Sequence, residues 1–438
     1  MFQKLIRKND TRRPEKGTAH LESRLSSTMA PLKIVICGGG VAGPALALWL
    51  SRSGHAVTVV ERFPALRASG AQIDLRGQGI EVVKRMGLMD VIRSKLVDEA
   101  GVAQVDSSNR AWATILANKS GKGVQGPTSE YEIMRGDLVR ILHDETKDKV
   151  TYIFGKTIER FEQDDQTVTA CFSDGTSDTF DILVGADGQG SRIRKAILPA
   201  NETEPYRRLG LYMAYWFNPR TEVDNNIRKM YHPGGGRMIM CRSHNNTETQ
   251  AYFAFKDDSE EMRSMPRAPI EQQKEFWSRK FKDSGWQTGR FIAGMETTDN
   301  FYCQEILQVR TDTWSKGRVV LLADAAHCPS PMSGMGTTGA FVGAYVLAGE
   351  IARNSHDLPT AFANYDRTLR PFVDEIQNVN IPLIRFMLFP NTQLQIVLFR
   401  LIVGFFCLLG LPQLIARLEG NENGGWQLPD YPEIELKG

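Results

Sequence analysis

The sequence predicts a mixed α/β protein with a discontinuous, Rossmann-like nucleotide-binding domain, a separate β-sheet domain and C-terminal helices. A short apolar strand, a glycine-rich turn and a helix occupy residues 33–53, and a second strand follows at residues 56–61. Another buried strand, loop and helix recur much later, at residues 318–353. Because strands that alternate with helices indicate a parallel sheet, two such units so far apart indicate one domain built from separate segments.

The composition is that of an ordinary globular protein. Of its 438 residues, 42% are hydrophobic and 24% are charged, and the net charge is only +2. Two or three domains are typical of this length, and the charge gives no support for a nucleic-acid partner. Six scattered cysteines, without a Cys-x-x-Cys pair or a Cys/His cluster at zinc spacing, predict a reduced, cytoplasmic protein without a bound metal.

Residues 1–30 are predicted to be a disordered extension. They are polar and basic, and they lack the apolar core of a secretory signal. Acidic residues at Asp10, Glu15 and Glu22 count against a mitochondrial targeting segment. The first strand begins only after Pro31.

The first motif is Gly38-x-Gly40-x-x-Gly43, placed between a strand and a helix. Gly38 permits a tight turn, Gly40 lets a pyrophosphate approach the backbone, and Gly43 lets the helix pack closely on the sheet. The helix N-terminus adds amide donors and positive partial charge for phosphates. Glu61 ends the second strand, where its carboxylate is placed to accept hydrogen bonds from ribose hydroxyls. The motif predicts a dinucleotide site without separating FAD from NAD.

The second motif decides between these cofactors. A buried strand ends at Asp324, and a Gly/Pro-rich loop leads into a helix of small residues that starts near Gly336 and Thr337. An aspartate there can hold a sugar-phosphate chain, and a helix N-terminus stabilises negative charge on a reduced flavin. An NAD dehydrogenase has no need of this second, distant nucleotide motif, so the pair predicts FAD.

The third motif runs from Asp181 to Arg194 and contains the turn Asp187-Gly188. It is a buried strand followed by a turn and a helix with Ser191 near its start. Helix capping explains this local pattern about as well as cofactor binding does.

These three motifs, in this order, resemble the flavin monooxygenases of the para-hydroxybenzoate hydroxylase type (the group A aromatic hydroxylases), and among them the tetracycline-inactivating branch. The resemblance covers residues 32–375 and is weak between 200 and 300. It implies that FAD, reduced by NAD(P)H, reacts with O₂ through a C4a-hydroperoxide to hydroxylate or epoxidise a small organic molecule. Since this chemistry requires no side-chain nucleophile, no catalytic residue is assigned.

The resemblance also implies roles for individual residues. It places Glu61 on the adenosine ribose and Arg135 and Asp324 on FAD, and it relates Asp187 to both FAD and NAD(P)H.

The stretch from Arg67 to Leu75 matches the same branch. There, Asp74 corresponds to an FAD contact and Arg67 to an NADPH contact. A solvated surface arginine is an equal alternative for Arg67.

Two positions depart from the family pattern. Ala323 stands where glycine usually precedes the aspartate, and one methyl group could crowd the pyrophosphate slightly. Met335 stands where a glutamine is common in the flavin loop, which favours an apolar substrate. His327, beside Asp324, is interpreted as a structural loop histidine.

The middle region is the least informative. Arg237 is a candidate to face the substrate, with a structural role at least as well supported. Tyr212 and Tyr215 fit a core role equally well.

The motifs predict the domain boundaries, and the resemblance implies the substrate class. The FAD-binding domain is expected from residues 31–100, 131–200 and 300–375, the substrate-binding domain from 101–130 and 201–299, and a C-terminal helical segment with a tail from 376–438. The expected substrate is an aromatic or polycyclic secondary metabolite. Alternatives are a flavin oxidoreductase without oxygen insertion and a non-catalytic carrier of lipid-like cargo on the same fold. A halogenase is disfavoured because no Trp-x-Trp-x-Ile-Pro stretch occurs.

Residues 381–416 are strongly apolar but are interrupted by Arg385 and Arg400. The uncharged stretch from Leu401 to Ala416 is shorter than the ~20 residues of a spanning helix and contains Pro412. A packed or interfacial helix pair is therefore predicted, which leaves peripheral membrane contact open.

Overall fold

The computed structural model describes residues 31–66, 70–118, 128–200, 202, 205–410 and 425–435. Its first sheet is built from segments that lie far apart in the sequence. The strand order is β17-β18-β11-β1-β2-β7, and all neighbours are parallel except β17 and β18. The strands are β1 (Lys33–Cys37), β2 (Ala56–Glu61), β7 (Thr151–Phe154), β11 (Ile182–Gly185), β17 (Ser315–Lys316) and β18 (Val319–Leu321). The predicted discontinuous domain is thus assembled around the central strand β1.

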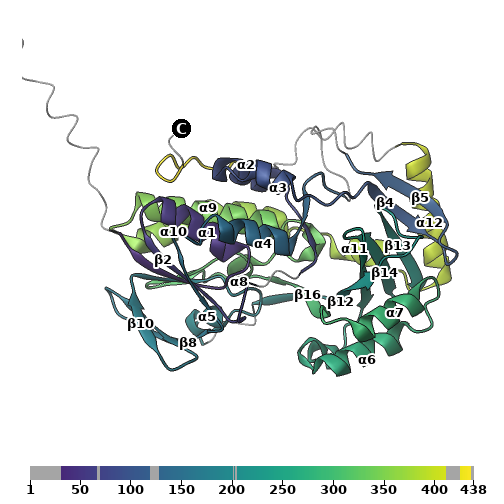
Figure 1. Cartoon of the computed structure of the whole chain (residues 1–438), viewed down its shortest axis with the longest axis horizontal. Coiled ribbons are helices and arrows are strands. Elements are labelled where there is room, and N and C mark those ends of the chain that lie inside the picture. The colour runs from purple at the N-terminus through teal and green to yellow at the C-terminus, as the bar shows by residue number, and fades with distance from the viewer. Residues whose placement is uncertain are drawn as a thin grey trace, which may run out of the picture. The chain divides into compact units, whose positions relative to one another are not determined.

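Helices cover this sheet and bury its apolar strands. Figure 1 shows α1, α4, α9 and α10 gathered on one side of it. Trp49 of α1 and Tyr345 of α9 meet edge to face at 5.3 Å. The helices are α1 (Ala42–Arg52), α2 (Gly77–Met86), α3 (Met89–Arg93), α4 (Arg135–Asp144), α5 (Arg192–Ile197), α8 (Asp324–His327), α9 (Gly336–Arg353) and α10 (Leu358–Gln377). A small antiparallel sheet of β8 (Ile158–Gln163), β9 (Val168–Phe172) and β10 (Ser177–Phe180) and a ribbon of β3 (Gln72–Asp74) and β6 (Glu132–Met134) complete this part.

The second sheet has seven strands in the order β16-β12-β15-β14-β13-β4-β5 and is antiparallel except where β13 meets β4. The strands are β4 (Gly101–Val105), β5 (Ala111–Leu116), β12 (Tyr206–Pro219), β13 (Ile227–Gly234), β14 (Arg237–Ser243), β15 (Glu248–Lys256) and β16 (Tyr302–Val309). Residues 302–309 therefore pair with β12, although the sequence placed residues from 300 onward in the FAD-binding domain. The backbone pairing with β12 assigns these residues to the second sheet.

Helices α6 (Ile270–Phe281) and α7 (Thr288–Thr297) cover one face of this second sheet (Figure 1). Trp216, Phe253 and Phe255 point to that side and form an aromatic core with Trp277, Phe281 and Phe291. Short 3₁₀ turns occur at Glu261–Arg263, Met265–Arg267 and Pro331–Ser333. The opposite face of the sheet is therefore the one left for a ligand.

A buried ion network ties the β3–β6 ribbon to the second sheet. The Arg242 guanidinium on β14 donates to both oxygens of Glu99 at 2.9 and 3.0 Å, and it also pairs with Glu132 of β6. The side chains of all three residues are at most 7% exposed. The two carboxylates raise the pKa of Arg242 against the opposing effect of its burial.

The C-terminal segment returns to both sheets. Helix α11 (Ile381–Leu388) packs on the second sheet beside Met238 and Leu211, and α12 (Gln393–Leu408) contacts β5 and β13. After residues 411–424, which lie outside the described part, Tyr431 is buried against α9, and its hydroxyl donates to Glu350 at 2.7 Å.

Within the described residues, no single helix meets the length and hydropathy of a membrane span. Residues 358–388 together with 393–408, bent by 112° at the break between them, meet that test only as a pair. The predicted extension at residues 1–30 and the end of the predicted apolar segment, residues 411–416, lie outside the described residues.

We expect Arg242→Met to lower the free energy of unfolding by about 3–5 kcal/mol, because two buried carboxylates would lose the Arg242 guanidinium and Glu99 would keep only the more distant Arg228 at 3.7 Å. Chemical denaturation of the FAD-loaded protein measures the change. Arg263→Met is the matched control, because the Arg263–Glu260 pair is exposed and should contribute less than about 1 kcal/mol. Equal effects of the two substitutions would contradict a structural role for the network.

Candidate functional site

Four parallel strands bring the predicted motifs to one edge of the first sheet. The Gly38 turn follows β1, Glu61 ends β2, Asp187 follows β11 and Asp324 follows β18. Because these strands are parallel, all four positions lie at the carboxyl edge, where open α/β sheets bind ligands. The convergence that the sequence predicted is thus a consequence of the sheet order.

The glycine turn is as tight as the motif predicts. Gly38 has φ +124°, and a Cβ added there would lie 2.3 Å from the Ala186 carbonyl oxygen. A Cβ on Gly43 would lie 2.0 Å from the Gly38 carbonyl oxygen, so a side chain is excluded at both positions. At Gly40 the nearest atom to an added Cβ is the Arg135 Nη2, at 3.3 Å. This turn therefore brings bare backbone and a guanidinium together, a combination suited to a pyrophosphate.

Glu61 is held against the turn by its own hydrogen bonds. One carboxylate oxygen accepts from the Gly39 N–H at 2.8 Å and the other from the Phe63 N–H at 3.0 Å. Each oxygen retains a further lone pair for a ribose hydroxyl. The side chain is only 9% exposed, so its position is fixed beside the first helix of the motif.

Arg135 and Asp324 influence each other electrostatically at this edge. Arg135 is the first residue of α4, and its aliphatic stem runs so close to Gly70 that an added Cβ there would lie 2.9 Å from its Cδ. Burial raises the pKa of Asp324, while Cys328 and the charges of Arg135 and Arg194 act in the opposite direction. Both predicted FAD ligands therefore belong to one electrostatic group.

The residue before Asp324 carries backbone strain. Ala323 has φ +54° and ψ −130°, a conformation that favours glycine. The glycine that the family usually has at this position is thus explained by the backbone as much as by space for the cofactor.

The start of α9 faces the β3–α2 turn, which brings in Asp74. The Arg76 N–H donates to the Thr338 hydroxyl at 3.1 Å, and that hydroxyl donates back to the Arg76 carbonyl at 3.0 Å. Asp74 pairs with Arg76 at 3.2 Å and lies 3.8 Å from a Cβ added at Gly334 in the flavin loop. The β3–α2 turn that carries Asp74 therefore lies against the flavin loop at Gly334 and the first turn of α9 at Thr338.

Gly336 and Thr337 are half-buried at the N-terminus of an 18-residue helix. Among the described residues, no atom lies within 4 Å of a Cβ added at Gly336. The helix N-terminus thus offers amide donors and positive partial charge toward open space, which suits a flavin ring.

Asp187 caps a helix and also retains a free acceptor. Its Oδ2 accepts from the Arg192 N–H at 2.7 Å, while its Oδ1 is buried without a partner among the described residues. A Cβ added at Gly38 would lie 3.2 Å from the Asp187 nitrogen. The capping interpretation is therefore correct, and the orphan oxygen next to the glycine turn favours a ligand contact as well.

Of the predicted site residues, only Arg67 lies outside the described part of the chain. The buried Arg194 was not singled out, although it donates to the Ala325 carbonyl at 2.8 Å and so supports the loop after Asp324. Its position at the helix end of the third motif was the available signal. His327 is buried against Trp314 and burial lowers its pKa to about 3, which fits a structural role.

The open face of the second sheet was missed by the sequence interpretation. Met213, Met240 and the flavin-loop residue Met332 are partly exposed and pack in one apolar cluster on that face. Tyr215 lies on the same side of β12 as Met213, and its ring is 5.6 Å from Tyr252 and 5.5 Å from Tyr302. An alternation of large apolar residues along β12 was the signal, but it does not tell which face meets the cofactor.

The remaining candidates of this region are structural. Tyr212 is buried on the helix-covered face, 5.7 Å from Phe255. Arg237 pairs with Asp283 at 2.6 Å and donates to the Lys280 carbonyl, both near the end of α6.

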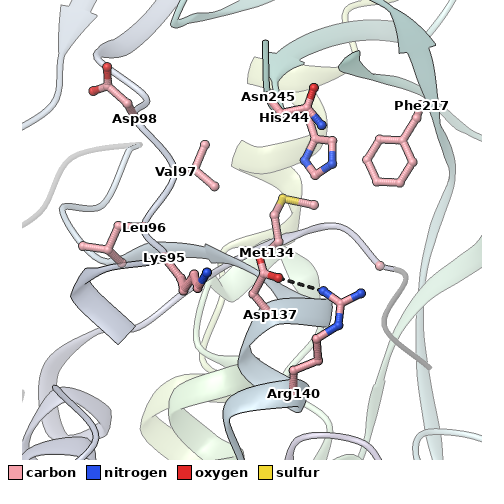
Figure 2. A pocket seen from close by; sticks show the side chains of 11 residues that line it. Lys95, Leu96, Val97, Asp98, Met134, Asp137, Arg140, Phe217, His244 and Asn245 are labelled. Carbon is pink, nitrogen blue, oxygen red and sulfur yellow. Dashed lines mark hydrogen bonds and ion pairs between the residues drawn. The ribbon is translucent and has the colours of Figure 1, made fainter. Parts of the chain in front are cut away.

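A cavity of about 420 Å³ opens beside α4, whose residues Asp137 and Arg140 line it (Figure 2). Phe217 and His244 stack at 4.5 Å with an angle of 24° on one wall, and burial lowers the pKa of His244. Asp137 and Arg140 of α4 pair at 2.9 Å on another wall. The lining residues are Gly70, Lys95, Leu96, Val97, Asp98, Met134, Asp137, Arg140, Phe217, His244 and Asn245. This lining is polar, in contrast to the methionine-rich face.

Comparisons with known proteins agree with this geometry. The FAD binding domain family matches residues 31–375. The FAD-dependent monooxygenase asL6 of Sarocladium schorii is 37% identical over 424 residues, covering 93% of this chain and 99% of its own. The flavin-dependent monooxygenase eupH of a Phoma species is 40% identical over 430 residues, covering 92% and 98%.

Solved structures show the same architecture. The tetracycline destructase Tet(55) superposes with a TM-score of 0.74 at 29% identity, covering 92% of this chain and 99% of its own. HpxO of Klebsiella pneumoniae, complexed with FAD and uric acid, superposes with a TM-score of 0.67 at 20% identity and supports the fold alone. The predicted fold class, family and FAD cofactor are confirmed, and this chain belongs to the FAD-dependent monooxygenases of the FAD binding domain family.

Proposed function

We propose that this monooxygenase uses NAD(P)H and O₂ to hydroxylate or epoxidise an aromatic or polycyclic secondary metabolite held on the methionine-rich face. The main support for this proposal is that Met332 of the flavin loop packs in the same apolar cluster as Met213 and Met240. FAD, when bound, takes two electrons from NAD(P)H and uses them to activate O₂.

The chain's own part in this reaction is to bind, orient and exclude water. Methionine side chains adapt to irregular apolar shapes and make favourable sulfur–aromatic contacts, which suits a flat, ring-rich substrate. Tyr215, Tyr252 and Tyr302 form the polar-tipped end of the same face. The similarity to the tetracycline destructase Tet(55) supports a polycyclic substrate class, and the similar fungal monooxygenases support secondary metabolism.

We further propose that the polar cavity admits NAD(P)H and not the apolar substrate. Lys95 supplies a positive charge for a phosphate group, and the Phe217–His244 stack offers a flat surface for a planar ring. The carboxylates of Asp98 and Asp137 can accept hydrogen bonds from ribose hydroxyls. Its wall residue Met134 directly precedes Arg135, so the cavity adjoins the FAD-binding edge.

Asp324→Ala and Arg135→Ala should purify folded but depleted of FAD. Each loses a charged hydrogen bond of about 1.5–3 kcal/mol, which weakens FAD binding roughly 10- to 150-fold. Flavin absorbance after dilution and gel filtration measures the retained FAD. Asp178→Ala, which removes an exposed carboxylate paired with Lys33, is the matched control. Full flavin retention in Asp324→Ala would contradict the assignment of that motif.

Met213→Thr and Met240→Thr should raise KM for an aromatic polyketide substrate about 5- to 30-fold, since each loses roughly 1–2 kcal/mol of apolar contact. Substrate-stimulated NAD(P)H oxidation across a polyketide library measures the effect, and ¹⁸O₂ should label the product. Met265→Thr changes a partly buried methionine on the helix-covered side and should leave KM unchanged. An unlabelled product would refute oxygen insertion, and unchanged KM values would refute the assigned face.

Lys95→Ala and Phe217→Ala should each weaken NAD(P)H binding about five-fold, corresponding to roughly 1 kcal/mol. Anaerobic flavin reduction at varied NADPH and NADH gives the dissociation constants. Lys282→Ala, behind the second sheet at the end of α6, serves as the control. If the variants changed KM for the organic substrate and not the coenzyme affinity, the cavity would belong to the substrate.

A further inference from the structure

Helix α12 turns an uninterrupted apolar face to solvent. Between residues 394 and 409, every exposed side chain is hydrocarbon, and Leu394, Leu401 and Leu408 are 77%, 65% and 83% exposed. The exposed residues are Leu394, Val397, Leu398, Leu401, Phe405, Phe406, Leu408 and Leu409. Such a continuous patch marks an interaction surface, because isolated exposed apolar residues do not cluster in this way.

The opposite side of α12 is part of the folded protein. Ile396 and Phe399 are buried, and the Phe399 ring meets the rings of Trp112 and His232 edge to face at 5.7 and 5.1 Å. Thr392 and Gln395 form a capping box that fixes the first turn of the helix. The outward residues are therefore held in place by the inward ones.

The chemistry of the face selects a lipid surface over a protein. A protein interface carries a polar rim with about one hydrogen bond per 100–200 Å². The outward side of α12 offers no side-chain donor or acceptor over four turns.

The charges near the helix leave this face neutral. Residues 381–410 contain no acidic residue, and of their two arginines Arg385 pairs with Asp258 at 2.5 Å. The Arg400 guanidinium lies over the Trp112 ring at 5.8 Å, on the sheet side, so the outward face stays uncharged.

The helix is too short to cross a bilayer. It has 16 residues, and no single described helix meets the test for a span. An apolar face of this length fits a helix that lies in the membrane interface with its hydrocarbon side in the acyl boundary.

We propose that α12 is the membrane-binding element of this enzyme and seats it on the surface of a lipid bilayer. Helix α11, which precedes α12 in the chain, packs on the substrate face, since Ile381, Ile384 and Leu388 belong to the same cluster as Met213 and Met240. An apolar substrate dissolved in the membrane then reaches that face without crossing bulk water. This last step rests on the proposed function, whereas membrane binding does not.

Vesicle flotation of the full-length, FAD-loaded protein tests the proposal. We expect the protein to float with phosphatidylcholine vesicles that contain 30% phosphatidylglycerol, a composition chosen for the test. Leu401→Glu/Phe405→Glu should lower the bound fraction about ten-fold or more, because two charges replace outward hydrocarbon. Normal flavin absorbance would show that this variant is folded.

The control variant is Val223→Glu/Ile270→Glu, which changes two exposed apolar residues elsewhere and should float like the unmodified chain. Absence of flotation, or equal flotation of both variants, would overturn the proposal. The alternative is that this face joins two copies of the chain, which light scattering tests. In that case the unmodified chain would be a dimer that does not bind vesicles, and Leu401→Glu/Phe405→Glu would be a monomer. Since flotation requires no turnover, a failed substrate assignment leaves its outcome unaffected.

Discussion

The parallel pairing of β1 with β2 and β11 is the constraint on which the site depends. Ile36 is in register with Val59 and Val184, so the three strands end together at one edge. At that edge the Gly38 turn must pass within contact distance of the Ala186 carbonyl, which only a glycine allows. A change of register in either pair would separate Glu61 or Asp187 from the turn, and neither residue alone forms a cofactor site.

The second sheet needs a separate constraint, because no strand is shared between the two sheets. The Arg242 network supplies it by joining β14 to Glu132 of the β3–β6 ribbon. The same ribbon leads into Asp74 on one strand and Arg135 after the other. A buried ion network is weak evidence for stability, but it demands one geometry, and that geometry orients the substrate face relative to the cofactor edge.

Local motifs were predictable from the sequence, and long-range pairing was not. The glycine triplet, Glu61 and Asp324 carry their meaning in short patterns, because backbone space and strand ends are local properties. Asp187 stayed ambiguous because capping and ligand binding use the same carboxylate, and only its buried second oxygen distinguishes them. The residues of β16 were placed in the wrong segment because a short strand does not reveal its partner strand, here β12, from its own sequence.

The substrate face illustrates the same limit. The alternation along β12 shows that Met213 and Tyr215 share a side, yet the sequence does not tell whether α6 or the flavin loop covers it. The burial of Tyr431 against α9 was equally unpredictable, because no pattern in the sequence before Tyr431 indicates which helix it contacts. Such contacts depend on where distant segments meet, which composition and periodicity do not encode.

No side chain of the site has been assigned a role as a proton donor or acceptor, and the ionisable side chains near Asp324 agree with this. Burial lowers the pKa of His327 and raises that of Cys328, so both are uncharged near neutral pH. Positive charge at the carboxyl edge of the first sheet comes instead from Arg135 and the N-terminus of α9. Both are fixed in position and act without proton transfer. With the oxidising chemistry supplied by FAD, the chain's selectivity must come from what the second sheet holds and what it keeps dry. In the proposed function, a face of adaptable methionines ending in tyrosines provides shape tolerance at one end and hydrogen bonding at the other, and this division would distinguish one ring-rich substrate from another.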